Sequence, residues 1–278
     1  MVIQAMDEVR NQLWTFAVFD KDNEEKSDDL VTSADYAAQQ IYMTMIQKNN
    51  PNAWIVAEED GVRTSPQWWS SIVYTIDPVD WTKALVRKQS DGIWTLFWVV
   101  DSIQNEIIAA YVGDIMTNEL YYYEEWWIVW RTAWWWSGND QRLQYSLRNQ
   151  KRILTLDDIR NFPERSNRIT KPRWYRNSLW VSNWSIGTNM AKLWKCEVDA
   201  VLLKSGLEQP RDWVPCAWIS HQLWYTTIAI ESDGSHRVVP MNQSWSLDAL
   251  RVPYQLIIHK HELADVLSLL DSVALEKK

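Results

Sequence analysis

The sequence predicts a protein of mixed α and β class, with helices and sheets stacked in layers. Two features of the pattern carry this prediction. Stretches with apolar residues at helical spacing occur near both ends of the chain, and short apolar runs of strand composition lie between them. With 278 residues, the chain can form one large domain or two smaller ones around substantial cores.

The first half of the chain is expected to begin with an amphipathic helix. Its apolar residues recur at helical spacing: Ile3, Met6, Val9, Leu13 and Phe16. Ser33 is expected to cap a second helix over about 34–48. Two buried strands follow, at 54–60 and 71–77, and both end in acidic residues.

Three further runs of strand composition cover 93–101, 106–115 and 119–125. The Gly, Asn and Asp residues between them favour tight antiparallel connections. The polar stretch 137–170 is the natural boundary between two subdomains, which we place at 1–150 and 151–278. The chain is expected to end in a helix near 261–275.

Composition and charge exclude several classes of protein. A net charge of −8 argues against nucleic-acid binding through a broad basic face, and it suits a protein that clusters carboxylates around cations. No run approaches the roughly 18 apolar residues of a membrane span. The first residues lack the basic and apolar regions of a secretory signal, so we expect a cytoplasmic protein with no membrane partner.

Acidic residues stand where predicted strands pass into loops, in three separate segments. The first segment has Asp35 in VTSAD, followed by Glu58 in VAEED. The second has Asp77 and Asp80 in IDPVDWT, and the third has Asp212 in PRDW. Several carboxylates in one cleft are costly unless a cation neutralises them. Because hard cations such as Mg²⁺ choose oxygen ligands, the pattern predicts a magnesium site.

The ordered set KSDDLVTSAD, AEED, DPVDWT and a later Asp resembles the inositol monophosphatase superfamily, from Lys26 to Trp224. This resemblance implies a layered α/β/α/β/α sandwich, of class α+β/α/β. Residues 1–150 would form an α+β half with an antiparallel sheet and most metal ligands, and 151–278 an α/β half that completes the metal site and the substrate pocket. Superfamily members are commonly homodimers.

The resemblance also implies roles for individual residues. Two or three Mg²⁺ ions would be held by Glu58, Asp77, the Val79 carbonyl, Asp80 and Asp212. The attacking water would be positioned and deprotonated by Glu58 and Thr82, with Asp35 supporting the Thr82 hydroxyl. The substrate would be bound by Trp81, Thr82, Lys83 and Asp199. The physical chemistry agrees, since two metal ions can activate water and neutralise a transferring phosphoryl group.

The implied activity is hydrolysis of a small phosphorylated metabolite by metal-activated water. VAEED and Lys83 look most similar to the 3′(2′),5′-bisphosphate nucleotidase branch, while inositol and histidinol phosphatases stay open. A non-catalytic relative that binds a phosphorylated ligand and a Trp-rich module that stacks sugars or bases are the competing hypotheses. There are also competing assignments for single residues. Asp35 could be a plain helix cap, and Glu59 or Asp60 could take the place of Glu58. Lys83 and Asp199 could have surface roles.

The chain contains 21 Trp and only 7 Gly, whereas about 19 Gly are usual at this length. Trp81, Trp184 and Trp224 stand where the superfamily has Gly, which serves positive φ or close approach to a ligand. Our hypothesis is that UGA codons, which specify Gly in some bacterial lineages, have been translated as Trp. Deliberate substitution and a degenerate, inactive relative are the alternatives.

Overall fold

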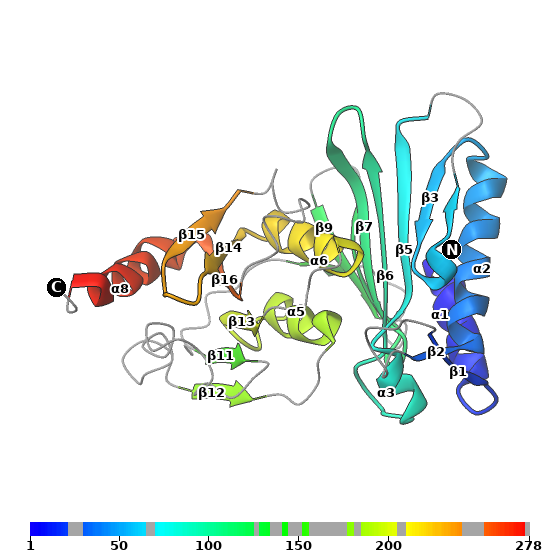
Figure 1. The fold of residues 1–278 in the computed structure, drawn as a ribbon, viewed down its shortest axis with the longest axis horizontal. Helices are drawn as coiled ribbons and strands as arrows, with labels where there is room; N and C mark the ends of the chain where they lie inside the picture. The colour runs from blue at the N-terminus through cyan, green and yellow to red at the C-terminus, as the bar shows by residue number, and fades with distance from the viewer. Residues whose placement is uncertain are drawn as a thin grey trace. The chain divides into compact units, whose positions relative to one another are not determined.

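The computed structural model describes residues 1–21, 30–64, 70–124, 128–133, 141–143, 152–155, 177–180, 185–204, 210–240 and 253–275. The chain divides into two compact units (Figure 1). Unit 1 comprises Met1–Arg142 and Ser185–Thr188, and unit 2 comprises Leu143–Trp184 and Asn189–Lys278. No helix in these described ranges is long and apolar enough to cross a bilayer.

Unit 1 is built on an eight-stranded sheet with the order β10-β9-β8-β7-β6-β5-β3-β4. Its strands are β3 (Trp54–Ala57), β4 (Arg63–Thr64), β5 (Ile72–Asp80), β6 (Trp94–Asp101), β7 (Glu106–Asp114), β8 (Glu119–Glu124), β9 (Ile128–Ala133) and β10 (Gln141–Arg142). Neighbouring strands are antiparallel, except that β3 and β5 run parallel. The antiparallel run predicted from 93 to 125 is confirmed.

Helices α1 (Val2–Gln12) and α2 (Ser33–Asn49) cover one face of this sheet (Figure 1). Their buried residues join one core with those of the sheet: Met6, Val9, Ala38, Tyr42, Ile55, Ile76 and Phe97. A two-stranded sheet of β1 (Val18–Asp20) and β2 (Leu30–Thr32) leads from one helix to the other. The short helix α3 (Thr82–Val86) follows β5. Both predicted helices are present.

Three details differ from the expected elements. Thr32, not Ser33, caps α2, because its side chain accepts from the backbone N–H of Asp35 while the Asp35 side chain accepts from the backbone N–H of Thr32. Strand β3 ends at Ala57, since the 3-10 helix η1 (Glu59–Gly61) begins two residues later. Strand β5 continues through Pro78 to Asp80 by way of a register shift against β6.

Unit 2 contains a six-stranded sheet with the order β12-β11-β13-β16-β14-β15. Its strands are β11 (Arg152–Thr155), β12 (Asn177–Trp180), β13 (Ala200–Lys204), β14 (Tyr225–Ile230), β15 (His236–Val239) and β16 (Tyr254–His259). β11 runs parallel to both β12 and β13, and the other neighbours are antiparallel.

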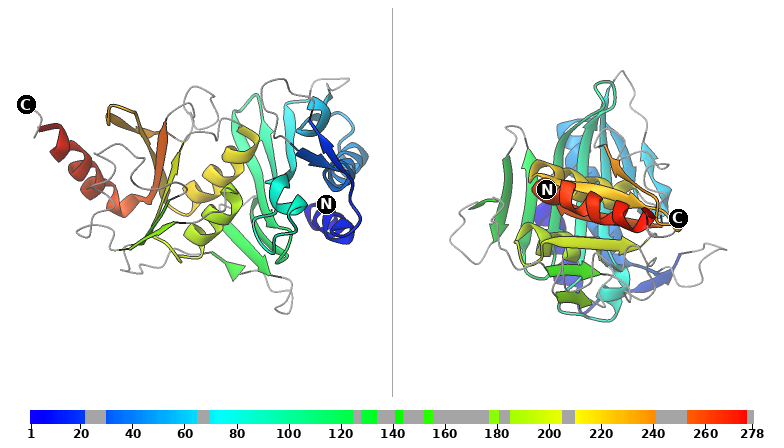
Figure 2. Two further views of the ribbon diagram at one scale, coloured as in Figure 1. Left: turned by 60° about the horizontal axis from the view of Figure 1, so that its bottom comes forward. Right: turned by 90° about the vertical axis from the view of Figure 1, so that its left-hand side faces the viewer.

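Helices lie on both faces of the unit 2 sheet (Figure 2). On one face, α8 (Leu263–Leu275) buries Val266 and Leu270 against the strands, which confirms the predicted final helix; the 3-10 turn η4 (Lys260–Glu262) precedes it. On the other face lie α5 (Ile186–Trp194) and α6 (Pro210–Gln222). The Trp194 indole N–H joins these two helices by donating to Ser220 Oγ at 2.9 Å.

Candidate active site

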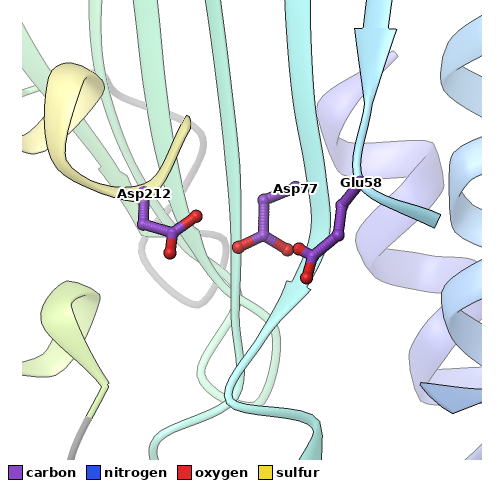
Figure 3. Close-up of side chains that lie close together, drawn as sticks. All are labelled: Glu58, Asp77 and Asp212. Carbon is purple, nitrogen blue, oxygen red and sulfur yellow. The ribbon is translucent and has the colours of Figure 1, made fainter. Parts of the chain in front are cut away.

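Two of the predicted metal ligands lie close together near the carboxyl ends of neighbouring parallel strands. Glu58 follows β3 directly, and its backbone N–H donates to the Ile76 carbonyl at 3.1 Å, which places it beside Asp77 of β5. The Glu58 and Asp77 carboxylates each offer an oxygen, and these oxygens lie within 4.8 Å of each other (Figure 3). Asp77 is only 2% exposed. These two acids, 19 positions apart in the sequence, therefore lie close together in the fold.

A lysine that the sequence reasoning missed neutralises part of this negative charge. Lys21 Nζ lies 3.1 Å from Glu58 Oε1 and 3.0 Å from Glu59 Oε2. Burial alone lowers the pKa of Lys21, but the charges of Glu58 and Glu59 raise it above its ordinary value overall. Burial and the nearby Glu58 raise the pKa of Glu59 to about 7. Lys21 belongs to none of the motifs, so no pattern in the sequence distinguishes it from other lysines.

The backbone around Pro78 is fixed by the side chain of Asp77. Asp77 Oδ1 accepts from the Val79 N–H at 3.1 Å, and the Asp77 carbonyl accepts from the Thr95 hydroxyl at 3.2 Å. The register of β5 against β6 shifts between Asp77 and Asp80. Because a bulge re-aims the side chains that follow it, this segment can turn out of the sheet at the site.

Asp35 serves two partners at once. Its Oδ2 accepts from the Thr32 N–H at 3.0 Å and from the Thr32 hydroxyl, and its Oδ1 accepts from the Thr82 hydroxyl at 2.9 Å. Burial raises the pKa of Asp35, and the hydrogen bonds from Thr32 and Thr82 oppose that rise. The helix-cap role and the contact with Thr82, which the sequence left as alternatives, therefore occur together.

Asp80 faces the start of α5. Its Oδ2 accepts from the Ser185 hydroxyl at 2.6 Å, and the backbone N–H groups of Ile186 and Gly187 also donate to its carboxylate. Burial raises the pKa of Asp80 to about 6, opposed by the Ser185 hydrogen bond and assisted by the charge of Glu58. The structure thus gives Asp80 a helix-terminus role that sequence reasoning did not foresee.

The backbone at two of the three suspect tryptophans adopts the conformation that glycine favours. Trp81 has φ 67° and ψ 54° and immediately precedes α3, and Trp224 also has φ 67°. Side chains with a Cβ rarely adopt this left-handed region. Trp184 lies outside the described residues. The geometry therefore agrees with the glycine expected at positions 81 and 224.

The remaining predicted residues lie on separate elements. Lys83 is in the first turn of α3, with its side chain half-buried. In unit 2, Asp212 lies in the first turn of α6, and Asp199, 8% exposed, directly precedes β13 (Figure 3 labels Asp212). Negative charge is stabilised in the first turn of a helix, so Asp212 also has a structural role there.

Comparison with known proteins gives the chain a family. The sequence matches the inositol monophosphatase family over residues 2–151. No curated protein matches it. Among solved structures, the extragenic suppressor protein SuhB from Bartonella henselae has a TM-score of 0.69 at 14% identity, covering 96% of this chain and 94% of SuhB. The IMPase of Thermotoga maritima has a TM-score of 0.64 at 15% identity, with 99% and 95% covered.

A third solved structure, of an IMPase/NADP phosphatase in complex with Mg²⁺ and phosphate, has a TM-score of 0.63 at 16% identity, covering 96% of this chain and 90% of that one. These likenesses confirm the predicted fold class, a layered sandwich of α and β elements. The family match spans more than half of the chain and contains Asp35, Glu58, Asp77 and Thr82. The protein belongs to the inositol monophosphatase family.

Proposed function

We propose that this chain is a Mg²⁺-dependent phosphomonoesterase that hydrolyses a small phosphorylated metabolite. A 3′(2′),5′-bisphosphate nucleotide and an inositol monophosphate are the two substrate classes that fit the sequence best. The observation that carries the proposal is the pair of converging carboxylates, Glu58 and Asp77, near the carboxyl ends of adjacent strands. The solved relative that holds Mg²⁺ and phosphate is consistent with this activity.

The carboxylate oxygens of the candidate site are suitable ligands for Mg²⁺. Carboxylate oxygens are hard ligands, and two of them within 4.8 Å repel each other unless a cation lies between or beside them. Two or three Mg²⁺ would be held by Glu58, Asp77, the Val79 carbonyl, Asp80 and Asp212. When bound, Mg²⁺ lowers the pKa of water and neutralises charge on the phosphoryl group.

Thr82 would orient the attacking water through its hydroxyl group. Its single proton is directed to Asp35 at 2.9 Å and, more weakly, to the Val79 carbonyl at 3.3 Å. The Thr82 oxygen is therefore left to accept a hydrogen bond, as from a water proton. Glu58 would receive the other proton, and Asp35 would keep the Thr82 hydroxyl in this orientation.

Binding of the phosphorylated substrate would fall to the turn after β5. The backbone N–H groups of Trp81 and Thr82 lie at the start of α3, and successive N–H groups in a turn of this kind can hold phosphate oxygens. Lys83 and Asp199 would contact the rest of the substrate. No covalent intermediate is needed, because water can attack the phosphorus directly.

A catalytically impaired relative that binds a phosphorylated ligand is the second candidate. The conformation of Trp81 favours it, because a residue with a Cβ at a left-handed position strains the turn that would bind phosphate. The two candidates make opposite predictions for phosphate release.

Phosphate release separates these candidates. The purified protein would be assayed with Mg²⁺ against 3′-phosphoadenosine 5′-phosphate, inositol 1-phosphate, histidinol phosphate and fructose 1,6-bisphosphate. We expect release from at least one of them, and a loss of about 100-fold or more in Asp77→Asn. Asp91→Asn, which changes an exposed acid, should retain full activity. Absence of release from all four would favour the impaired relative.

A further inference from the structure

The Lys21 side chain lies between two neighbouring carboxylates, those of Glu58 and Glu59. Its ammonium contacts Glu58 and Glu59 at 3.0–3.1 Å, and only 17% of its side chain is exposed. Glu59 is 2% exposed and accepts Lys21 with both carboxylate oxygens. Its backbone is also fixed, because the Gln39 side chain bonds to both its N–H and its carbonyl. Lys21 is thus held from one side by a rigid, buried carboxylate.

The other partner of Lys21 is the proposed metal ligand. Glu58 Oε1 accepts from Lys21 Nζ at 3.1 Å, while the Glu58 carboxylate also lies within 4.8 Å of Asp77. A divalent ion that binds Glu58 and Asp77 would therefore lie close to the Lys21 ammonium, which is bound to the same Glu58 carboxylate. Like charges at such distances repel strongly in partly buried surroundings.

We propose that Lys21 is a built-in cation that competes with the divalent metal for Glu58 and so weakens metal binding at the Glu58–Asp77 pair. This inference rests on the proposed function, since it concerns the same metal site. In the metal-free protein, Lys21 bridges Glu58 and Glu59 and stabilises both. When a divalent ion binds Glu58, the Lys21 ammonium leaves it and keeps only Glu59.

Isothermal titration calorimetry with Mg²⁺ and Mn²⁺ tests the proposal without any substrate. Lys21→Met keeps most of the aliphatic stem and removes the charge, so it should bind the ions about tenfold more tightly than the wild type. Lys21→Arg keeps the charge and should bind like the wild type. Lys48→Met, an exposed lysine in the last turn of α2, is the matched control and should leave the affinity unchanged.

The outcomes distinguish the two proposals. If Lys21→Met alone binds the ions more tightly than the wild type, the competition between Lys21 and the metal is supported. If Lys21→Met binds them equally or more weakly, the competition is overturned. If neither the wild type nor any variant binds either ion, the proposed metal site itself is wrong.

A second measurement uses the wild-type chain, in case the Lys21 variants fail to fold. Acetylation of lysines, followed by mass spectrometry, would compare the reactivity of Lys21 with and without Mn²⁺, with Lys48 as the internal reference. The competition predicts that Mn²⁺ raises the reactivity of Lys21 severalfold, because its ammonium is released from Glu58. Unchanged reactivity at saturating Mn²⁺ would overturn the inference.

Discussion

The Thr82 hydroxyl donates a hydrogen bond to Asp35 Oδ1 at 2.9 Å, although the two residues are 47 positions apart. Asp35 is at the same time the partner of Thr32 in the capping box of α2. The turn that would bind phosphate is therefore attached to the buried N-terminus of a long helix. Such a connection holds a catalytic hydroxyl in one orientation before any ligand arrives.

Thr82→Val should lower kcat by about 100-fold or more, because the attacking water loses its acceptor while the fold keeps a side chain of the same shape. Thr82→Ser should restore most of the activity. Thr32→Ala should instead cost about 1 kcal/mol of stability through loss of the helix cap. Steady-state kinetics and thermal unfolding of the three variants check this division. A Thr82→Val enzyme with normal kcat would exclude the assigned role.

Trp81→Gly should stabilise the protein by about 1 kcal/mol, because glycine adopts φ 67° without the penalty that a Cβ incurs. It should also raise phosphate release, since the turn that would bind phosphate is no longer strained. Trp224→Gly relieves the same backbone strain outside the assigned site, so it should raise the melting temperature and leave kcat unchanged. Loss of stability in both variants would refute the glycine interpretation.

Asp80 and Glu59 should contribute less to the stability of the metal-free protein as pH rises through the range in which they titrate. Burial raises the pKa of Asp80 to about 6 and that of Glu59 to about 7, so the folded state binds these protons more tightly than the unfolded state. This contribution is complete below the unfolded pKa values, near 4, and is lost as pH rises through the folded values.

In EDTA, the melting temperature of the wild type should therefore fall relative to that of Asp80→Asn between about pH 5 and about pH 7.5, because the asparagine does not titrate. Added Mg²⁺ should reverse the loss at the higher pH, because the ionised carboxylates then have a cation. A difference in melting temperature between the wild type and Asp80→Asn that stays constant across these pH values without metal would contradict the assignment of the buried acids.

Gly187→Ala should destabilise the protein by about 1–3 kcal/mol. A Cβ at this position would come within 2.4 Å of the Trp94 ring, whose indole N–H is fixed by a 2.8 Å hydrogen bond to Thr188. The start of α5 would shift and weaken its bonds to Asp80. Chemical denaturation measures the loss, and Trp94→Leu in the same chain should recover part of it by removing the obstructing ring.

The sequence revealed the acids and the contact between Asp35 and Thr82, but not the partners of Glu58 and Asp80. Glu58 and Asp77 were predictable because strands that end in acids, in a known order, resemble one family. Lys21 was not, since its contacts with Glu58 and Glu59 depend on tertiary folding across 37 and 38 positions. The bond from Ser185 to Asp80 spans 105 positions and leaves no local pattern.

The bounds of the second and last helices were predictable to within two residues, but the first helix ends at Gln12, before Leu13 and Phe16 of the predicted pattern. The N-cap of the second helix was predicted wrongly, for a physical reason. Ser33 and Thr32 are both good capping residues, so composition alone could not choose between them. The choice follows from Asp35, which lies three residues after Thr32 and completes a reciprocal pair of hydrogen bonds. The strain at Trp81 was predictable only through the resemblance to a family with glycine there.

Anomalous diffraction from crystals soaked in Mn²⁺ tests the central claim most directly. A strong difference peak at about 2 Å from carboxylate oxygens of both Glu58 and Asp77 is the result we expect. If saturating Mn²⁺ leaves that position empty while Lys21 still contacts Glu58, these acids form a structural ion-pair cluster, and the metal-dependent phosphatase proposal is wrong.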